Sequence, residues 1–187
     1  VIVWDLPQKT RVATLAADGV KQTALALSAD GRRAVTGGQD GALRVWDVAE
    51  ARLERMLAGH AGAMRAVALT PDGRRVVSGG DDATARLWDL AAGAATLRFE
   101  GHAQAVLAVA IDAAGARVAA ASADGAARLW DAATGAELRK VDSLKGPFHA
   151  VALLAHGQFA VGADDGAIRL FDPEGRERMR YFPSLNR

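Results

Sequence analysis

The sequence predicts an all-β fold built from repeated four-stranded antiparallel units, and two observations predict it. The first is a tryptophan–aspartate pair that recurs every 42 residues, at Trp4–Asp5, Trp46–Asp47, Trp88–Asp89 and Trp130–Asp131. A related pair, Phe171–Asp172, follows after 41 residues. The second is a set of glycine-containing turns and short apolar runs that recur at the same interval. An internal period of this length is typical of a repeat architecture, so the period decides the fold.

Two turns stand at equivalent places in the units. The earlier turn contains a glycine, at Gly31, Gly73, Gly115 and Gly157. The later turn, shortly before the aromatic residue, contains an aspartate, at Asp40, Asp82, Asp124 and Asp165. Glycine and aspartate favour tight turns, and turn signals about every 10 residues between short apolar runs predict strands.

The unit that begins at Gly59 shows the four predicted strands most clearly. They lie at Ala63–Leu69, Arg75–Ser78, Ala85–Asp89 and Ala94–Phe99. In the next unit, the alanine-rich segment Ala113–Ala127 favours a helix by propensity alone. We expect strands there as well, because the period places this segment in register with Pro71–Ala85 and because Gly115 and Gly125 interrupt it.

Composition excludes several classes of protein. Half of the 187 residues are hydrophobic and 24% are charged, as in a folded globular domain. The 23 basic and 22 acidic residues give a net charge of +1, so nucleic acid and anionic membranes are not expected as partners. The absence of cysteine excludes disulfides and thiolate metal sites. No signal peptide is visible, which favours the cytoplasm, but the chain begins at Val1 without a methionine, so the compartment stays open.

Gly-His pairs open two of the units, at Gly59–His60 and Gly101–His102, and the order Gly-His, Asp-Gly, Asp and Trp-Asp over about 42 residues resembles the WD-repeat β-propeller family; the resemblance covers essentially the whole chain. It implies a ring of blades, each a four-stranded antiparallel sheet, that serves as a platform for assembling other proteins. On this basis we expect the outer two strands of a truncated blade at residues 1–17, complete blades at 18–58, 59–100 and 101–142, and a degenerate blade at 143–187.

The resemblance also implies a chain of hydrogen bonds inside a blade, and one blade carries all four residue types for it, at His60, Ser78, Asp82 and Trp88. A buried indole or imidazole nitrogen without a partner costs about 1–3 kcal/mol, so the chain is expected to stabilise the blade. The other blades depart from the pattern. The first has Asp18 where histidine is expected, the third has Ala120 in place of the hydroxyl, and the fourth keeps only Asp165.

Catalytic and metal-binding alternatives exist for the same residues. His60, Ser78 and Asp82 are also the residue types of a hydrolase triad. The structural role is favoured, because no Gly-x-Ser-x-Gly elbow is present and the positions recur in degenerate form in other units. Asp81–Asp82 and Asp164–Asp165 suggest a calcium loop, but the ligand spacing of an EF-hand is missing. We therefore expect no catalytic residue, no metal and no cofactor.

An arginine stands two residues before each aromatic position, at Arg44, Arg86, Arg128 and Arg169. A basic stripe for nucleic acid is one interpretation. Because the net charge is close to zero, we favour another, in which the stems cover the outer sheet and the charged heads reach water.

In the family that the chain resembles, partners usually bind the face that carries the loop into the first strand and the turn between the second and third strands. The resemblance assigns this candidate protein-binding face to Lys21, Thr23, Gln39, Arg65, Asp81, Leu107, His149 and Asp164. Ordinary solvation of a surface also explains any one of these residues.

The predicted function is a protein-interaction scaffold that binds other proteins or peptides and has no catalysis of its own. The alternative is a propeller segment of a larger bacterial regulatory or enzymatic protein whose catalytic domain lies outside this chain. We also expect the remaining blades of the same propeller as a partner, because the predicted strands form an open arc. The 187-residue chain is then expected to self-associate through its exposed end blades or to aggregate.

Overall fold

The computed structural model describes residues 1–5, 7–17, 19–143 and 146–182. In these residues the regular structure is β-strand, apart from one short 3-10 turn, η1 (Ala155–Gly157). The strands form one two-stranded and four four-stranded sheets, all antiparallel, and consecutive strands are neighbours within each sheet. The all-β fold class predicted from the 42-residue period is confirmed.

The strand bounds repeat with the period. The two-stranded sheet contains β1 (Ile2–Asp5) and β2 (Thr10–Thr14). The next contains β3 (Gln22–Leu27), β4 (Arg33–Gly38), β5 (Ala42–Asp47) and β6 (Arg52–Ala58). The third contains β7 (Met64–Leu69), β8 (Arg75–Gly80), β9 (Ala85–Asp89) and β10 (Ala94–Phe99). The fourth contains β11 (Val106–Ile111), β12 (Arg117–Ser122), β13 (Ala126–Asp131) and β14 (Glu137–Asp142). The last contains β15 (Phe148–Leu153), β16 (Phe159–Ala163), β17 (Ile168–Phe171) and β18 (Glu177–Tyr181).

The alanine-rich segment forms strands β12 and β13, as the period predicts. Ala119, Ala120 and Ala121 of β12 are buried almost completely between neighbouring sheets. Burial and strand pairing therefore override the helix propensity of alanine at this place.

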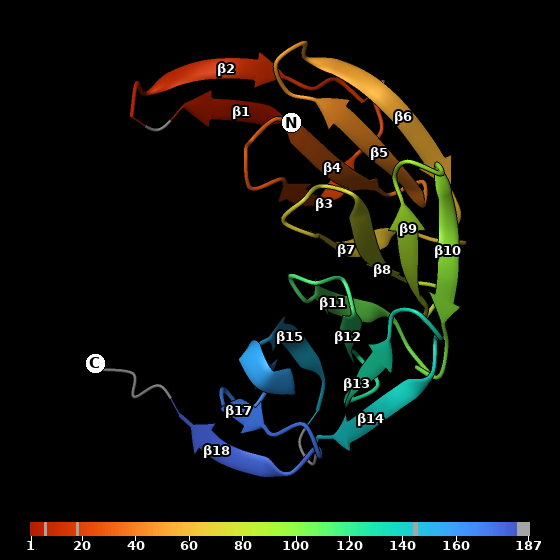
Figure 1. Cartoon of the computed structure of the whole chain (residues 1–187), viewed down its shortest axis with the longest axis vertical. Helices are drawn as coiled ribbons and strands as arrows, with labels where there is room; N and C mark the ends of the chain where they lie inside the picture. The colour runs from red at the N-terminus through yellow and green to blue at the C-terminus, as the bar shows by residue number, and fades with distance from the viewer. Residues whose placement is uncertain (6, 18, 144–145, 183–187) are drawn as a thin grey trace.

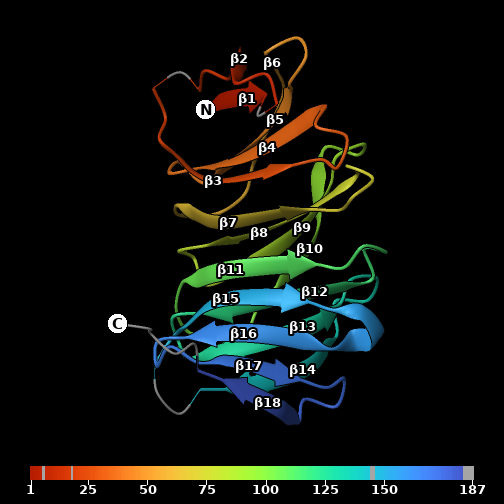
Figure 2. The same cartoon turned by 90° about the vertical axis from the view of Figure 1, so that its left-hand side faces the viewer.

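The five sheets form an open arc, with β3, β7, β11 and β15 along its inner side and β6, β10, β14 and β18 along its outer side (Figure 1). Seen from the open side, the sheets are stacked on one another (Figure 2). A hydrophobic core lies between each pair of adjacent sheets. Val106 of β11, for example, belongs to the same core as Val77 of β8. Each sheet therefore depends on its neighbours for burial of its apolar faces.

Glycines allow the closest approach between sheets at two of these cores. A Cβ atom on Gly79 of β8 would overlap Cγ1 of Val106 and lie 2.9 Å from Cγ1 of Val109, both on β11. A Cβ atom on Gly37 of β4 would lie 2.7 Å from Cβ of Met64, the first residue of β7. The first residue of an inner strand thus occupies the space that the glycine of the preceding sheet leaves free.

The two end sheets expose large apolar side chains. Trp4 and Val12 of the first sheet are 56% and 55% exposed, and Met179 and Tyr181 of the last sheet are 61% and 55% exposed. Contiguous exposed apolar surface favours association, so we expect the 187-residue chain to self-associate through these faces. Sedimentation velocity should show a mass above that of the monomer that rises with concentration. A monomer at every concentration that binds no hydrophobic dye contradicts this prediction.

Candidate functional site

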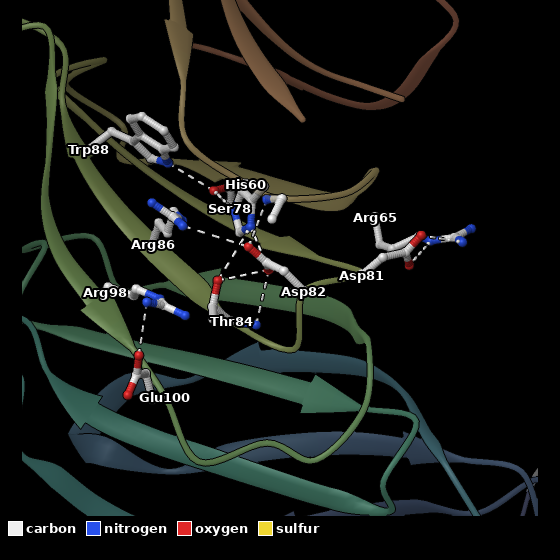
Figure 3. Close-up of polar contacts among 11 residues, drawn as sticks. His60, Arg65, Ser78, Asp81, Asp82, Thr84, Arg86, Trp88, Arg98 and Glu100 are labelled. Carbon is white, nitrogen blue, oxygen red and sulfur yellow. Dashed lines mark hydrogen bonds and ion pairs between the residues drawn. The ribbon is translucent and has the colours of Figure 1, made fainter. Parts of the chain in front are cut away.

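The structure brings His60, Ser78, Asp82 and Trp88 together in the sheet β7–β10 (Figure 3). Trp88 Nε1 donates to Ser78 Oγ at 2.8 Å, and Ser78 Oγ lies 2.8 Å from His60 Nε2. His60 Nδ1 lies 2.8 Å from Asp82 Oδ1. Because an ionised carboxylate only accepts, Nδ1 carries the proton and Nε2 accepts from the Ser78 hydroxyl. The Trp88 indole N–H, the Ser78 hydroxyl and the His60 Nδ1–H therefore each have a hydrogen-bond acceptor.

Asp82 also organises the turn between β8 and β9. Its Oδ1 accepts from Thr84 Oγ1 at 2.8 Å, and its Oδ2 accepts from the Ala61 N–H at 3.1 Å. Burial alone would raise the pKa of Asp82, but the hydrogen bonds from His60, Ala61 and Thr84 outweigh it and lower that pKa to about 2. Thr84 is a member of this cluster that was not expected from the sequence. No pattern marks it, because the equivalent positions are alanines, Ala42, Ala126 and Ala167.

The sheet β3–β6 contains a shorter version of the chain. Trp46 Nε1 donates to Thr36 Oγ1 at 3.0 Å, and the Thr36 hydroxyl donates to Gln22 Oε1 at 2.6 Å. The side-chain oxygen of Gln22 in β3 thus accepts the hydrogen bond that His60 Nε2 accepts in the next sheet. Asp18, which occupies the expected histidine position in the sequence, lies outside the described residues.

The sheet β11–β14 leaves the chain incomplete. His102 Nδ1 lies 3.0 Å from Asp124 Oδ2, but His102 Nε2 is buried and has no hydrogen-bond partner among the residues that the structure describes. Ala120 pairs with Arg128 in the strand register, as Ser78 pairs with Arg86. The missing hydroxyl would therefore lie where Ala120 now stands.

The last sheet replaces the polar chain with aromatic packing. Phe171, at the tryptophan position, stacks on Phe159 with ring centroids 5.1 Å apart and an interplanar angle of 15°. Both rings are buried. Phenylalanine therefore fills the volume of the indole without needing a hydrogen-bond acceptor.

The contacts of Ser78, His60 and Asp82 have the connectivity of a hydrolase triad, so their burial decides what they can do. Ser78 and the side chain of His60 have no exposed surface. Ser78 Oγ already accepts from the Trp88 indole. A nucleophile must reach a substrate carbonyl, and this hydroxyl is enclosed. The geometry fits a structural link between strands.

The described part of the chain contains no group of three or more histidine, aspartate or glutamate side chains that could hold a metal ion. Within the same residues, no helix is long and apolar enough to cross a membrane.

The four arginines near the aromatic positions differ from the expectation that their heads reach water. Arg44 and Arg169 are only 5% exposed. Each of the four guanidinium groups forms an ion pair with a carboxylate of its own sheet: Arg44 with Asp40, Arg86 with Asp82, Arg128 with Glu137 and Arg169 with Asp165. Three of these partners are the turn aspartates four residues earlier. That Asp-x-x-x-Arg spacing was the signal in the sequence, and it explains why the guanidinium groups of these three arginines are engaged within their own sheets.

Burial lowers the pKa of His60 and of His102 below the ordinary value, and this effect outweighs the attraction of Asp82 and Asp124. Since the unfolded histidines titrate near pH 6.5, the unfolded chain binds more protons below that pH. We expect the free energy of unfolding to be fully retained above about pH 6.5 and to fall as the pH decreases below it.

Urea midpoints at about pH 7.5 and about pH 5 measure this dependence. His102→Gln should reduce the difference, because it removes one of the two histidines whose pKa burial lowers. Equal midpoints for the unaltered chain at the two pH values contradict the prediction.

The candidate protein-binding residues lie at one edge of the four-stranded sheets, where the first strand begins and the second turns into the third. The strand register shifts by one residue at the same place in each first strand. The residues at these β-bulges are Thr23, Arg65, Leu107 and His149. A bulge removes a residue from the strand ladder and redirects its side chain. In each four-stranded sheet, one residue of the candidate protein-binding face therefore lies at the bulge and is not paired in the strand ladder.

Two bulge residues form ion pairs with the neighbouring turn. Arg65 Nε and Nη2 bind the two carboxylate oxygens of Asp81 at 2.6 and 2.8 Å, and this pair is largely exposed. His149 Nε2 lies 2.5 Å from Asp164 Oδ1. The Arg65–Asp81 pair presents a cation and an anion side by side, so either charge is available to a partner only in the presence of the other.

The remaining candidates have different surroundings. Thr23 Oγ1 donates to the carbonyl of Met64 in the next sheet at 2.5 Å, so its hydroxyl links two sheets. Lys21 and Gln39 are exposed and joined by a backbone hydrogen bond of 2.9 Å. Leu107 is half-buried. The structure brings candidates together in pairs in three sheets, Lys21 with Gln39, Arg65 with Asp81 and His149 with Asp164, whereas Leu107 is the single candidate in the sheet β11–β14.

The family model of the WD domain, G-beta repeat, matches residues 9–47, 51–89 and 93–131, which is more than half of the chain. The chain belongs to the WD-repeat family. Each match ends at the aspartate of a tryptophan–aspartate pair. No match to a curated protein was found.

The last sheet, β15–β18, lies beyond the matched WD repeats but has the same four-stranded antiparallel order. Its sequence lacks the tryptophan and the polar chain of the matched repeats. Its strands and its bulge at His149 are nevertheless those of a WD blade. The WD repeats and the propeller-like sheets are those of a domain that serves as a protein-interaction scaffold.

Proposed function

We propose that this WD-repeat chain binds proteins or peptides through the edge that carries the four bulges, and that it has no catalysis of its own. The observation that supports the edge is the bulge in each first strand, which places Thr23, Arg65, Leu107 and His149 at equivalent positions. The four side chains differ in charge, size and hydrogen-bonding capacity. A repeated backbone position with unlike side chains suits recognition of a specific partner surface.

The exposed Arg65–Asp81 pair offers the strongest polar contact on this edge. A bidentate arginine–carboxylate pair has fixed geometry, and its remaining donors and acceptors can bind a partner. Exposed pairs contribute little to stability, so their charges can be changed without unfolding the chain. These properties make Arg65 and Asp81 the best positions for testing the proposal.

We expect Arg65→Glu and Asp81→Lys each to reduce capture of a partner from lysate of the source cells about tenfold or more, as at an interface hot spot. Arg74→Glu is the matched control, because Arg74 is highly exposed but lies at the opposite edge, in the turn between β7 and β8. Captured proteins are compared by quantitative mass spectrometry, and circular dichroism verifies each fold. Equal capture by all four chains would place the interface elsewhere.

A further inference from the structure

An arginine begins the second strand of three sheets and reaches toward the neighbouring sheet. Arg33 Nη1 donates to the carbonyl of Gly73 at 3.2 Å, and Arg75 Nη1 donates to the carbonyl of Gly115 at 3.0 Å. Arg117 begins β12 at the same place in the repeat. Within the described residues, its guanidinium has no hydrogen bond and no ion pair. Arg33 and Arg75 therefore each donate to a backbone carbonyl of the next sheet, whereas Arg117 does not.

The difference comes from the turn that Arg117 faces. After β7, the Thr70 N–H donates to the carbonyl of Arg75, five residues on. After β15, the Leu154 N–H donates to the carbonyl of Gln158, four residues on. This turn is one residue tighter, closes through η1 and holds His156 at φ 59°. Its changed path does not present a carbonyl to Arg117 as the turns at Gly73 and Gly115 do for Arg33 and Arg75.

A pocket of about 660 Å³ lies where the turns after β11 and β15 meet, with walls formed by Ile111, Ala114, Arg117, Leu153, Leu154 and His156. The pocket at the equivalent place between the sheets β3–β6 and β7–β10 measures about 350 Å³ and is lined mainly by polar and charged residues, among them Asp30, Arg33, Glu54 and Asp72. The pocket at this place in the repeat is thus larger between the sheets β11–β14 and β15–β18, and more of its lining residues are apolar.

The charges around Arg117 favour a neutral acceptor. Asp112 also lines the pocket, with its Oδ1 bound to the Ala116 N–H at 2.7 Å. Asp131, across the strand register from Arg117, holds the N–H groups of its own turn. An incoming carboxylate would meet the Asp112 anion in the pocket, whereas a carbonyl would accept from Arg117 as the carbonyls of Gly73 and Gly115 do from Arg33 and Arg75.

We propose that this pocket binds an extended peptide segment of a partner protein, with a large apolar side chain between Ile111, Leu153 and Leu154 and a main-chain carbonyl that accepts from Arg117. The proposal rests on the proposed function in that the ligand is a peptide. The site, however, lies at the edge opposite the bulges, because it is formed by the turns between first and second strands. The two surfaces can therefore be tested separately.

The test uses a random peptide library displayed on phage, selected on the immobilised 187-residue chain. Enriched peptides should share a large apolar residue. Synthetic copies should bind Arg117→Gln and Leu154→Asp chains at least about tenfold more weakly than the unaltered chain. Arg75→Gln is the matched control. It should keep the affinity but melt at a lower temperature because it loses a hydrogen bond to Gly115, whereas Arg117→Gln should melt like the unaltered chain.

Three outcomes would overturn the proposal. The first is that no peptide is enriched, or that Arg117→Gln binds the peptides unchanged. The second is affinity that disappears when a carboxylate of the peptide is converted to an amide, which indicates an acidic ligand. The third is binding that Arg65→Glu removes and Arg117→Gln does not, which would support the bulge edge and leave this pocket without a role.

Discussion

Replacing Ser78 with alanine should lower the free energy of unfolding by about 1–3 kcal/mol. The Ser78 hydroxyl links Trp88 Nε1 to His60 Nε2, with both contacts at 2.8 Å and no exposed surface on Ser78. Alanine leaves a buried donor and a buried acceptor unpaired, which costs more than one exposed hydrogen bond. Urea unfolding at neutral pH, followed by circular dichroism, measures the change.

The matched substitution is Ala120→Ser in the sheet β11–β14. His102 Nε2 is already buried there without a partner in the described chain, and Ala120 has the strand register of Ser78. A serine should donate to His102 and accept from Trp130, so the chain should become more stable or stay unchanged. If both substitutions shift the urea midpoint by the same small amount, buried hydrogen bonding does not stabilise these blades.

Replacing Gly79 with alanine should destabilise the chain by about 1–3 kcal/mol, because the new methyl group overfills a close-packed core. It would overlap Val106 Cγ1 and crowd Val109 Cγ1 on the next sheet. Both valines are buried in the core between these sheets, where little space remains for the sheets to shift. The urea midpoint of the variant measures the cost.

The second substitution Val106→Ala identifies the cause. It removes the atom that the new methyl group would overlap, so the double variant should lose less stability than the sum of the two single losses. Gly166→Ala provides a control for the loss of a glycine without crowding, since nothing lies within 4 Å of a Cβ atom there, although its positive φ adds some strain. Strict additivity of Gly79→Ala and Val106→Ala would mean that contact between sheets is not the source of the effect.

The period predicted the sheets well because it reports on turns and strand length at once. Two of the four strands expected after Gly59, Ala85–Asp89 and Ala94–Phe99, have the predicted bounds, and the others differ by one or two residues at one end. The resemblance to WD repeats led to the four residues that meet around His60, because it implied which positions within one repeat are linked by hydrogen bonds.

The remaining features of the site depend on side-chain positions and strand register, which the spacing of residues along the sequence does not specify. Gln22 replaces a histidine from a different place in the repeat, and only the fold shows that its side chain reaches Thr36. The bulge at Arg65 and the ion pair with Asp81 follow from strand register, which one residue of slippage would change. The buried arginines were misjudged because a net charge close to zero describes the whole surface and not the inside of a blade.

Because each hydrophobic core lies between two adjacent sheets, a destabilising change in one sheet acts first on its immediate neighbours. A disturbance at Ser78 acts directly on β3–β6 and β11–β14, and reaches β15–β18 only through the latter. The chain therefore behaves as a linear array of coupled units, whose cooperativity depends on the strength of each contact plane. Amide exchange should be slowest in β8 and β12 and faster toward both termini, and denaturation should spread from one sheet to the next.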